Sequence, residues 1–248
     1  MPFGNNNFGM GQGPRSYDYD ITRGRAATQE GLSDFFRGVF TWMTIGLMLT
    51  GFISYFVAMD KPLIGYLYTH VMLFYVLMGI QLAAVLGLSF GINRLPADIS
   101  EAIFLFYSAL TGVTFSFIFL VYTNQSIEIV FFLTAVSFGL LAFLGYTTKR
   151  DLTEMGNFMM VGLFAIIIAM VVNFFLHSST LMYVVSILGV VIFLGLTAYD
   201  MQKLKQIYLS GSFDTRKETV MGALALYLDF INLFLMLLTL FGGGGRRR

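Results

Sequence analysis

Apolar residues along this chain gather into seven long runs, and short polar segments separate one run from the next. Each run is close to the roughly 20 residues that a membrane-spanning helix needs. Backbone N–H and C=O groups in lipid must bond within their own segment, which favours helices. The pattern therefore predicts an all-α integral membrane protein, a bundle of seven transmembrane helices. The runs are 40–59, 71–90, 102–122, 129–147, 158–176, 181–199 and 220–241.

The polar ends of the chain divide it into three predicted parts. Residues 1–33 are rich in Gly and Asn and are expected to form a flexible polar cytoplasmic tail. This segment has no short apolar core followed by a small-residue cleavage site, so it is not a cleavable signal. Residues 34–242 form the seven-helix membrane domain, and residues 243–248 form a Gly/Arg-rich C-terminal tail.

The composition agrees with a membrane protein and excludes several classes of function. Hydrophobic residues make up 57% of the 248 residues, charged residues make up 12%, and the mean hydropathy is +0.76. Soluble domains are about 25% charged. The net charge of +1 provides no basic field that would call for nucleic acid. The chain has no cysteine, which excludes disulfides, thiolate nucleophiles and cysteine-ligated metals but leaves the compartment undecided.

The distribution of Lys and Arg predicts the orientation in the membrane. Most of these side chains lie in the first tail and in the second, fourth and sixth connections, whereas the first connection has Lys61 alone. Positive residues favour the cytoplasmic side, so the N-terminus is predicted to be cytoplasmic. Seven spans then place Arg246, Arg247 and Arg248 outside, against the same rule. A re-entrant last segment is the alternative, and the bias of the earlier connections favours seven full spans.

One carboxylate lies in the middle of the last apolar run. At about 100° per residue, Gly222, Ala225 and Asn232 share the helix face of Asp229. Small residues permit close helix approach, so this stripe is predicted to face protein. A charged side chain at this depth is costly in lipid and usually serves function.

A second aspartate lies near the end of the sixth run. Asp200 shares a helix face with Ser186, Gly189 and Thr197. Because the sixth and seventh helices run in opposite directions, both aspartates are expected in the cytoplasmic half, side by side if these helices pack together. The alternative for Asp200 is a solvated acid at a helix end.

The sequence contains no motif of a known intramembrane enzyme. It lacks the HExxH pattern of a metalloprotease, a Ser–His pair at membrane depth and a glycine loop that precedes a helix. His70 and His177 lie far apart in sequence without a partner ligand, so no metal site is expected. A retinal protein is excluded because the apolar part of the last run has no lysine. Asn173 in the fifth run is expected to cap a helix end or to form a hydrogen bond between helices.

Two strings near the C-terminal end carry a family resemblance. "LTAYDMQ" at 196–202, followed by "GALALYLDFINLFLMLLTLFG" at 222–242, resembles the signature of the Bax inhibitor-1 family, also called the transmembrane Bax-inhibitor-motif family. "ALTGVTFSFIFLVY" and "RAATQEGLSDFFRGVFTWMTIGLMLTG" are similar to bacterial members. The resemblance covers nearly the whole chain beyond the first 22 or so residues.

The resemblance implies a fold, a location and an activity. Family members form a seven-helix bundle with the last helix central, and the chain is expected in the bacterial inner membrane. Bacterial members are thought to leak Ca²⁺ in a pH-dependent way, with two aspartates that share a proton and match Asp200 and Asp229 here. These two are therefore the predicted pH sensor, gate and transient calcium ligands, and Arg94 is the candidate for an arginine that latches an aspartate. The supporting polar residues are Asn173, Thr197, Tyr227 and Asn232.

The sequence leaves three functions open. The first is a pH-sensitive cation (Ca²⁺) leak channel, with calcium as transported ion, no bound cofactor, and the lipid bilayer, calcium ions and protons as partners. The second is a regulatory membrane protein that modulates a membrane protease or a stress or cell-death pathway. The third is a slow cation/proton exchanger. No enzymatic activity is expected for any of them.

Overall fold

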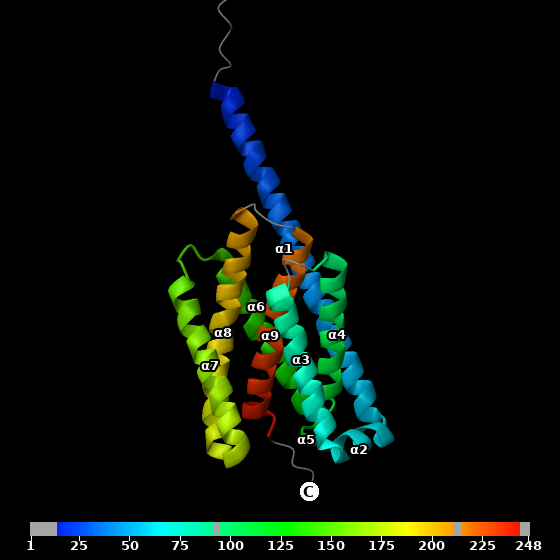
Figure 1. The fold of residues 1–248 in the computed structure, drawn as a ribbon. Helices are drawn as coiled ribbons and strands as arrows, with labels where there is room; N and C mark the ends of the chain where they lie inside the picture. The colour runs from blue at the N-terminus through cyan, green and yellow to red at the C-terminus, as the bar shows by residue number, and fades with distance from the viewer. Residues whose placement is uncertain (1–13, 92–94, 211–214, 244–248) are drawn as a thin grey trace, which may run out of the picture.

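The computed structural model describes residues 14–91, 95–210 and 215–243, and the regular elements in these ranges are all helices. Figure 1 shows the long helices side by side as a bundle, with α2 and α5 at one end and the start of α1 projecting from the other. The helices are α1 (Pro14–Met59), α2 (Lys61–Thr69), α3 (Val71–Gly91), α4 (Ala97–Phe115), α5 (Ile118–Val121), α6 (Asn124–Thr147), α7 (Thr153–Leu176), α8 (Ser179–Ser210) and α9 (Thr215–Phe241).

Six segments in the described part of the chain are long and apolar enough to cross a membrane. Large apolar side chains on these helices point outwards, and Phe132, Phe158 and Phe175 are exposed by 70%, 73% and 75%. Soluble monomers rarely expose large contiguous apolar patches, so this surface fits lipid. The predicted all-α membrane class is confirmed, whereas the predicted count of seven is not. The six segments are Glu30–Met59, Ala97–Val121, Asn124–Thr147, Thr153–Leu176, Ser179–Ser210 and Arg216–Phe241.

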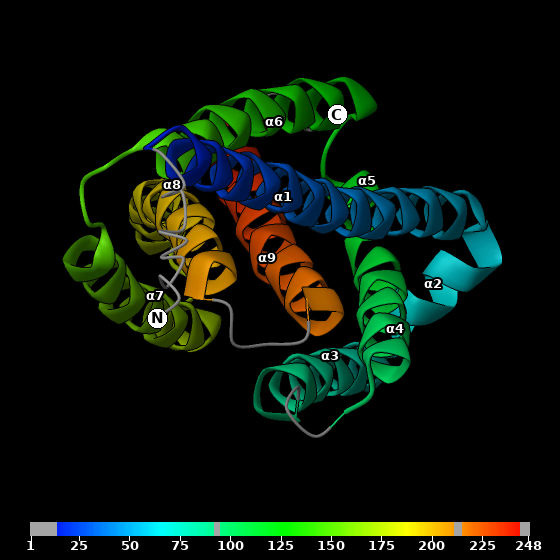
Figure 2. The same cartoon turned by 90° about the horizontal axis from the view of Figure 1, so that it is seen from above.

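The predicted second span corresponds to α3. Of the seven predicted spans, this is the one whose apolar segment is too short to be counted as membrane-spanning. Among the residues of α3 whose side chains are described, the apolar segment is Tyr75–Leu88, which is shorter than the roughly 20 residues that a span needs. In this helix the described side chains are mostly exposed or half-buried, and Leu88 is the buried one among them. α3 packs on α4, at the outside of the bundle (Figure 2).

Two short features were not predicted from the apolar runs. The third run is divided into α4 and α5 near Ser116, whose hydroxyl donates to the Val113 carbonyl at 2.6 Å. α2 precedes α3, and its start carries a capping signal. The Asp60 carboxylate accepts a hydrogen bond from the Leu63 N–H, and Pro62 stands in the first turn, where a proline N–H is not needed.

The first helix extends beyond the membrane segment. The backbone of α1 is helical from Pro14, so it passes through part of the segment 1–33 that the composition predicts as a flexible tail. The division of the chain at residue 33 stays a prediction. The C-terminal tail 243–248 lies, apart from Gly243, outside the described residues.

Helix α9 is the centre of the bundle. It packs against α1, α4, α6 and α8, while α7 packs outside on α8 (Figure 2). Val220, Ala223, Leu226, Tyr227 and Leu233 on α9 are fully buried, as expected for a helix enclosed by neighbours. α9 is also one unbroken helix from Thr215 to Phe241, without the turn that a re-entrant segment would need.

Candidate functional site

A cavity of about 900 Å³ lies on one side of α9, and both aspartates of the predicted pair line it. Its walls come from α3, α4, α7, α8 and α9. Most of the lining is apolar. The polar and charged lining residues are Gln81, Tyr107, Asn157, Tyr199, Asp200, Lys203, Glu218, Asp229 and Asn232.

Asp229 is the most deeply placed of these carboxyl groups. Its side chain is on α9 in the middle of the bundle and has a relative exposure of 5%. Its Oδ2 atom is buried and has no hydrogen-bond partner among the residues that the structure describes. Gly222, Ala225 and Asn232 line the same cavity, so the stripe predicted from the helical spacing does face this space. A buried carboxyl oxygen without a partner is costly, which makes this atom the most unusual polar group in the cavity.

Asp200 reaches the cavity from α8, which runs antiparallel to α9. Gly189 on α8 lies against Met236, and Leu204 lies against Gly222. Between these two contacts the helices bring Asp200 to within about one helical turn of the level of Asp229. The two carboxyl groups interact electrostatically.

A cation and a third acid also line the cavity near its charged end. Lys203 follows Asp200 by one turn of α8 and interacts with it electrostatically. Glu218 contributes from the first turn of α9. The phenols of Tyr107 and Tyr199 complete the ionisable groups in the lining. Asp200 therefore interacts with a carboxyl group, that of Asp229, and with a cation, Lys203.

Of the four predicted supporting residues, Asn232 lines the cavity, whereas Thr197, Asn173 and Tyr227 do not. The Thr197 side chain is fully buried, and its hydroxyl donates to the Phe193 carbonyl of its own helix at 2.7 Å. Asn173 lies at the other end of the bundle, in the last turn of α7. Its Oδ1 accepts from the Ser178 N–H at 3.0 Å, next to His177, which has a left-handed backbone with φ of 50°. Asn173 closes this helical hairpin and lies away from the aspartates.

Tyr227 points to the opposite side of α9 from the cavity. Its hydroxyl lies 2.7 Å from the Thr50 hydroxyl, which in turn donates to the Ser108 carbonyl at 2.9 Å. Since the Thr50 hydroxyl has a single hydrogen, Tyr227 is the donor in the first bond. The rings of Phe104 and Tyr107 lie edge-on to the Tyr227 ring. Tyr227 therefore ties α9 to α1 and α4.

The candidate latch residue Arg94 lies outside the described residues. An arginine that joins two helices at this end of the bundle is Arg216, at the start of α9. Its Nε and Nη2 donate to the two carboxylate oxygens of Glu101 at 2.7 and 2.9 Å, and Nη2 also lies 2.7 Å from Asp98. This contact joins the first turns of α9 and α4. In the sequence, this contact is indicated by two acids three residues apart, Asp98 and Glu101, at the start of α4.

The polar C-terminal end of α8 holds the connection between α6 and α7 in place. Gln202 accepts from the Leu152 N–H at 2.8 Å and donates to the Arg150 carbonyl at 2.7 Å. Lys205 donates to the Tyr146 carbonyl, in the last turn of α6, at 2.9 Å. These bonds fix the part of α8 that carries Asp200, and the apolar pattern gave no signal for them.

The same connection contains an acid outside the membrane segments. Asp151 Oδ1 accepts from both the N–H and the hydroxyl of Thr153, at 2.9 and 2.6 Å. These hydrogen bonds favour the ionised form and lower the pKa of the Asp151 carboxyl. Among the described residues, no group of three or more His, Cys, Asp or Glu side chains is placed to hold a metal ion.

The fold and the cavity define the class: an integral membrane protein made of helices, with a carboxyl pair inside the bundle. The profile of a family described as "Inhibitor of apoptosis-promoting Bax1" matches residues 32–247. The chain belongs to this family, the Bax inhibitor-1 family, which confirms the resemblance found in its sequence.

Relatives from distant bacteria match most of the chain. "Inner membrane protein YbhL" of Escherichia coli (strain K12) is 47% identical over 216 residues, which cover 86% of this chain and 92% of the relative. An uncharacterized protein of Borreliella burgdorferi is 43% identical over 211 residues, 84% of this chain and 91% of the relative. One of Deinococcus radiodurans is 40% identical over 215 residues, 86% of this chain and 92% of the relative.

Proposed function

We propose that this protein is a pH-sensitive calcium leak pathway of the bacterial inner membrane, gated by Asp200 and Asp229. The observation that carries the proposal is the Oδ2 atom of Asp229, which is buried in a cavity that Asp200 also lines and has no hydrogen-bond partner in the described part of the chain. A carboxyl group in this position costs stability unless a proton or a cation accompanies it.

The proton is the first part of the mechanism. Two neighbouring carboxyl groups that share one proton carry a single negative charge and titrate as a unit. When the pH rises and this proton leaves, two anions face each other. At 4 Å and an effective dielectric constant near 20, their repulsion is about 4 kcal/mol. A change of this size matches the few kcal/mol that separate two conformations of a protein, so it suffices to change how α8 packs on α9.

The calcium ion is the second part. Ca²⁺ prefers oxygen ligands and takes six to eight of them, often with several from water. The cavity offers the carboxylates of Asp200 and Asp229, and the side-chain amides of Asn157 and Asn232 lie in the same lining. Lys203 competes with Ca²⁺ for the carboxylates and so weakens the binding of the ion. Weak binding suits an ion that is transported rather than one that stays bound. Calcium is here the transported ion and not a resident cofactor.

Seven spans remain part of the proposal, and the direction of neighbouring helices supports the seventh. Gly46 of α1 lies against Phe104 of α4, and Thr50 of α1 lies against Gly112, farther along α4. The two helices are therefore parallel, which supports a chain between them that returns across the membrane. α3 has 21 residues, which at 1.5 Å per residue is about the 30 Å of the hydrocarbon core. With the Lys and Arg distribution, this topology has a cytoplasmic N-terminus.

The proposal is tested by Ca²⁺ flux into liposomes that contain the purified protein, measured across a range of pH. Asp229→Asn and Asp200→Asn cannot ionise, so each should remove most of the pH response. Asp229→Glu keeps a carboxyl group and should keep the response with a moved midpoint. Asp60→Asn is the matched control, because Asp60 caps α2 away from the cavity and Asn caps helices equally well.

The outcomes separate the alternatives. If Asp229→Asn conducts Ca²⁺ with the pH profile of the unaltered protein, the shared proton is not the gate. If an imposed proton gradient drives Ca²⁺ uphill, the protein is an exchanger and not a leak. If no flux is seen at any pH while the protein is folded, the regulatory function takes the place of transport.

A further inference from the structure

A second hollow lies on the other side of α9, between α1 and α6. This groove has a volume of about 580 Å³, and its floor is formed by Phe230 of α9 and Met201 of α8. We call it the α1–α6 groove. Its α1 wall includes Phe36, Phe40 and Met43, and its α6 wall includes Ala135, Gly139 and Ala142.

The small residues of the α6 wall keep the groove open. Small residues on membrane helices usually mark a place where a second helix packs closely. At Gly145, near the end of α6, that is the case, because an added Cβ would overlap the backbone of Ala198 on α8. At Gly139 an added Cβ would meet nothing within 4 Å. The space beside Gly139 therefore holds no atom of the described residues.

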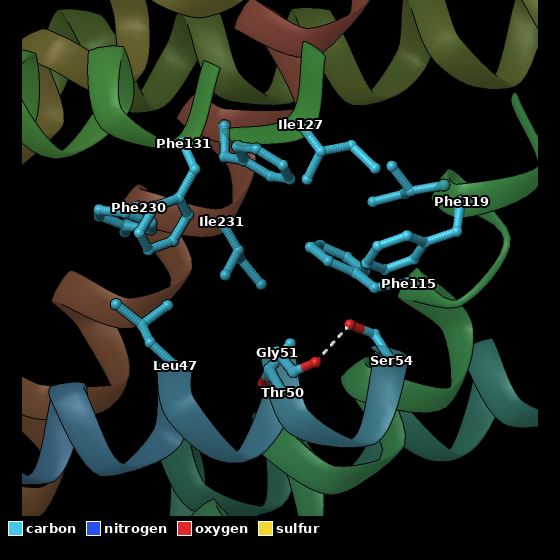
Figure 3. Close-up of a pocket in the computed structure, with 12 residues that line it drawn as sticks. Leu47, Thr50, Gly51, Ser54, Phe115, Phe119, Ile127, Phe131, Phe230 and Ile231 are labelled. Atoms are coloured by element: carbon cyan, nitrogen blue, oxygen red, sulfur yellow. Dashed lines mark hydrogen bonds between the residues drawn. The ribbon is translucent and has the colours of Figure 1, made fainter. Parts of the chain in front are cut away.

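The length of the groove matches one leaflet of a bilayer. Its α1 wall runs from Ser33 to Leu47, which is about 21 Å at 1.5 Å per residue. One leaflet has about 15 Å of hydrocarbon and several ångströms of headgroup region. Beyond Leu47 the α1–α6 groove is followed by a smaller cavity of about 120 Å³. This cavity reaches Ser54, where Phe115 and Phe119 face α1 (Figure 3).

The volume of the groove favours a lipid chain over another helix. A helix about 10 Å in diameter and 21 Å long fills about 1,600 Å³, nearly three times the volume of the groove. Such a helix would rest on the rim. The volume instead falls within the 300–1,000 Å³ that is usual for small-molecule sites. The lining is almost wholly apolar, as an acyl chain requires.

The charged end of the groove favours an anionic headgroup. Tyr146 lines this end, and the Lys205 ammonium lies 4.9 Å from the centre of its ring. Lys205 uses one of its three N–H donors on the Tyr146 carbonyl. Lys149 and Arg150 follow directly at the end of α6. Basic pockets between membrane helices on the cytoplasmic side are typical sites for anionic lipid headgroups.

We propose that the α1–α6 groove binds one anionic phospholipid, with an acyl chain against Gly139 and the phosphate at Lys205. The bilayer itself supplies this ligand, and no change in the aspartate cavity is needed for it to bind. A bound chain would complete the wall that α1 and α6 leave open beside Phe230.

The chain part of the site is tested by filling the groove. The full-length protein is placed in vesicles of equal parts phosphatidylglycerol and phosphatidylcholine, extracted with detergent and weighed by native mass spectrometry. We expect one phosphatidylglycerol per chain. Gly139→Phe should lower this retention about tenfold, or about 1.4 kcal/mol. Gly87→Phe is the matched control, since its added side chain also starts in open space but on α3, outside the groove.

Gly139→Leu serves as a smaller replacement if the Phe variant does not fold, and it should reduce retention in the same direction. Equal lipid retention in Gly139→Leu and Gly87→Phe would overturn the proposal. A lipid-free dimer that Gly139→Leu dissociates would also overturn it, since the occupant would then be a second copy of the chain.

The headgroup part is tested by Lys205→Gln, which keeps an N–H donor for Tyr146 but removes the charge. Retention should continue, while the preference for phosphatidylglycerol over phosphatidylcholine should fall towards one. Lys217→Gln is the control, because Lys217 lies at the start of α9 and does not line the groove. This variant should keep the preference for phosphatidylglycerol. An unchanged preference in Lys205→Gln would show that no anion binds at this end.

Discussion

The hydroxyl of Tyr227 joins three helices through two hydrogen bonds. It donates to Thr50, and Thr50 donates to the Ser108 carbonyl, so α9, α1 and α4 meet at one buried point. The Tyr227 side chain is fully buried, and Thr50 has a relative exposure of 4%. Because the bonds form a chain, Thr50 takes part in both of them and Tyr227 in one.

This difference predicts unequal effects of two conservative substitutions. Tyr227→Phe loses one hydrogen bond and should lower the free energy of unfolding by about 0.6 kcal/mol, the average for such bonds in a membrane protein. Thr50→Val keeps the shape, loses both bonds and should cost about 1–3 kcal/mol. Denaturation in mixed detergent micelles measures both values. The double variant should be no less stable than Thr50→Val, and a fully additive result would contradict the hydrogen-bonded chain.

Helical spacing predicted part of the site and could have predicted more. It correctly placed Gly222, Ala225 and Asn232 on the face of Asp229 that lines the cavity. The same arithmetic separates Tyr227 from Asp229 by about 200°, which assigns Tyr227 to another face. Thr197 could not be assigned this way. Its spacing favours the face of Asp200, yet its side chain is fully buried and does not line the cavity, which spacing along one helix does not show.

Among the elements, α6 shows how one helix can be closely packed at one end and open along its middle. At Gly145 the backbone of α8 comes so close that an added Cβ would overlap the Ala198 carbonyl. At Gly139, less than two turns away, there is open space. The two glycines are therefore in opposite environments on the same helix.

Replacing each glycine by alanine should separate these environments. Gly145→Ala forces α6 away from α8 and should destabilise the protein by about 1–3 kcal/mol, as overpacking does. Gly139→Ala removes a flexible residue from a helix without a clash and should be neutral or stabilise by up to about 1 kcal/mol. Thermal unfolding in detergent compares the two. Equal effects of the two changes would show that α6 and α8 are less tightly joined at Gly145.

Hydropathy predicted the apolar parts of the helices better than it predicted where the helices end. The runs 181–199 and 40–59 fall inside α8 and α1, but both helices continue well into polar sequence. They continue because they pack on each other there: the rings of Phe35 and Tyr208 stack at 5.3 Å. Such contacts between distant segments are not visible in a local pattern. The Asp60 and Pro62 signal of α2, in contrast, was local and could have been recognised.

For the molecule as a whole, the side of the membrane on which each end lies is a direct test of the proposed topology. A reporter fused after Ser210 should report the cytoplasm, because the second, fourth and sixth connections carry most of the Lys and Arg residues. A reporter fused after Arg248 should report the outside. A cytoplasmic result after Arg248 would leave an even number of spans, and α3 would then not cross the membrane.

The central position of α9 has a consequence for how the bundle is made. A chain leaves the ribosome from its N-terminus, so α1, α4, α6 and α8 are all synthesised before the helix that they share. Until α9 arrives, the faces that will enclose it have no partner. α9 also carries Asp229 into the membrane, which is costly in lipid alone and less so among helices. Assembly is therefore expected to end with α9 entering a ring of helices already in place, so that folding is completed only after translation has passed Phe241.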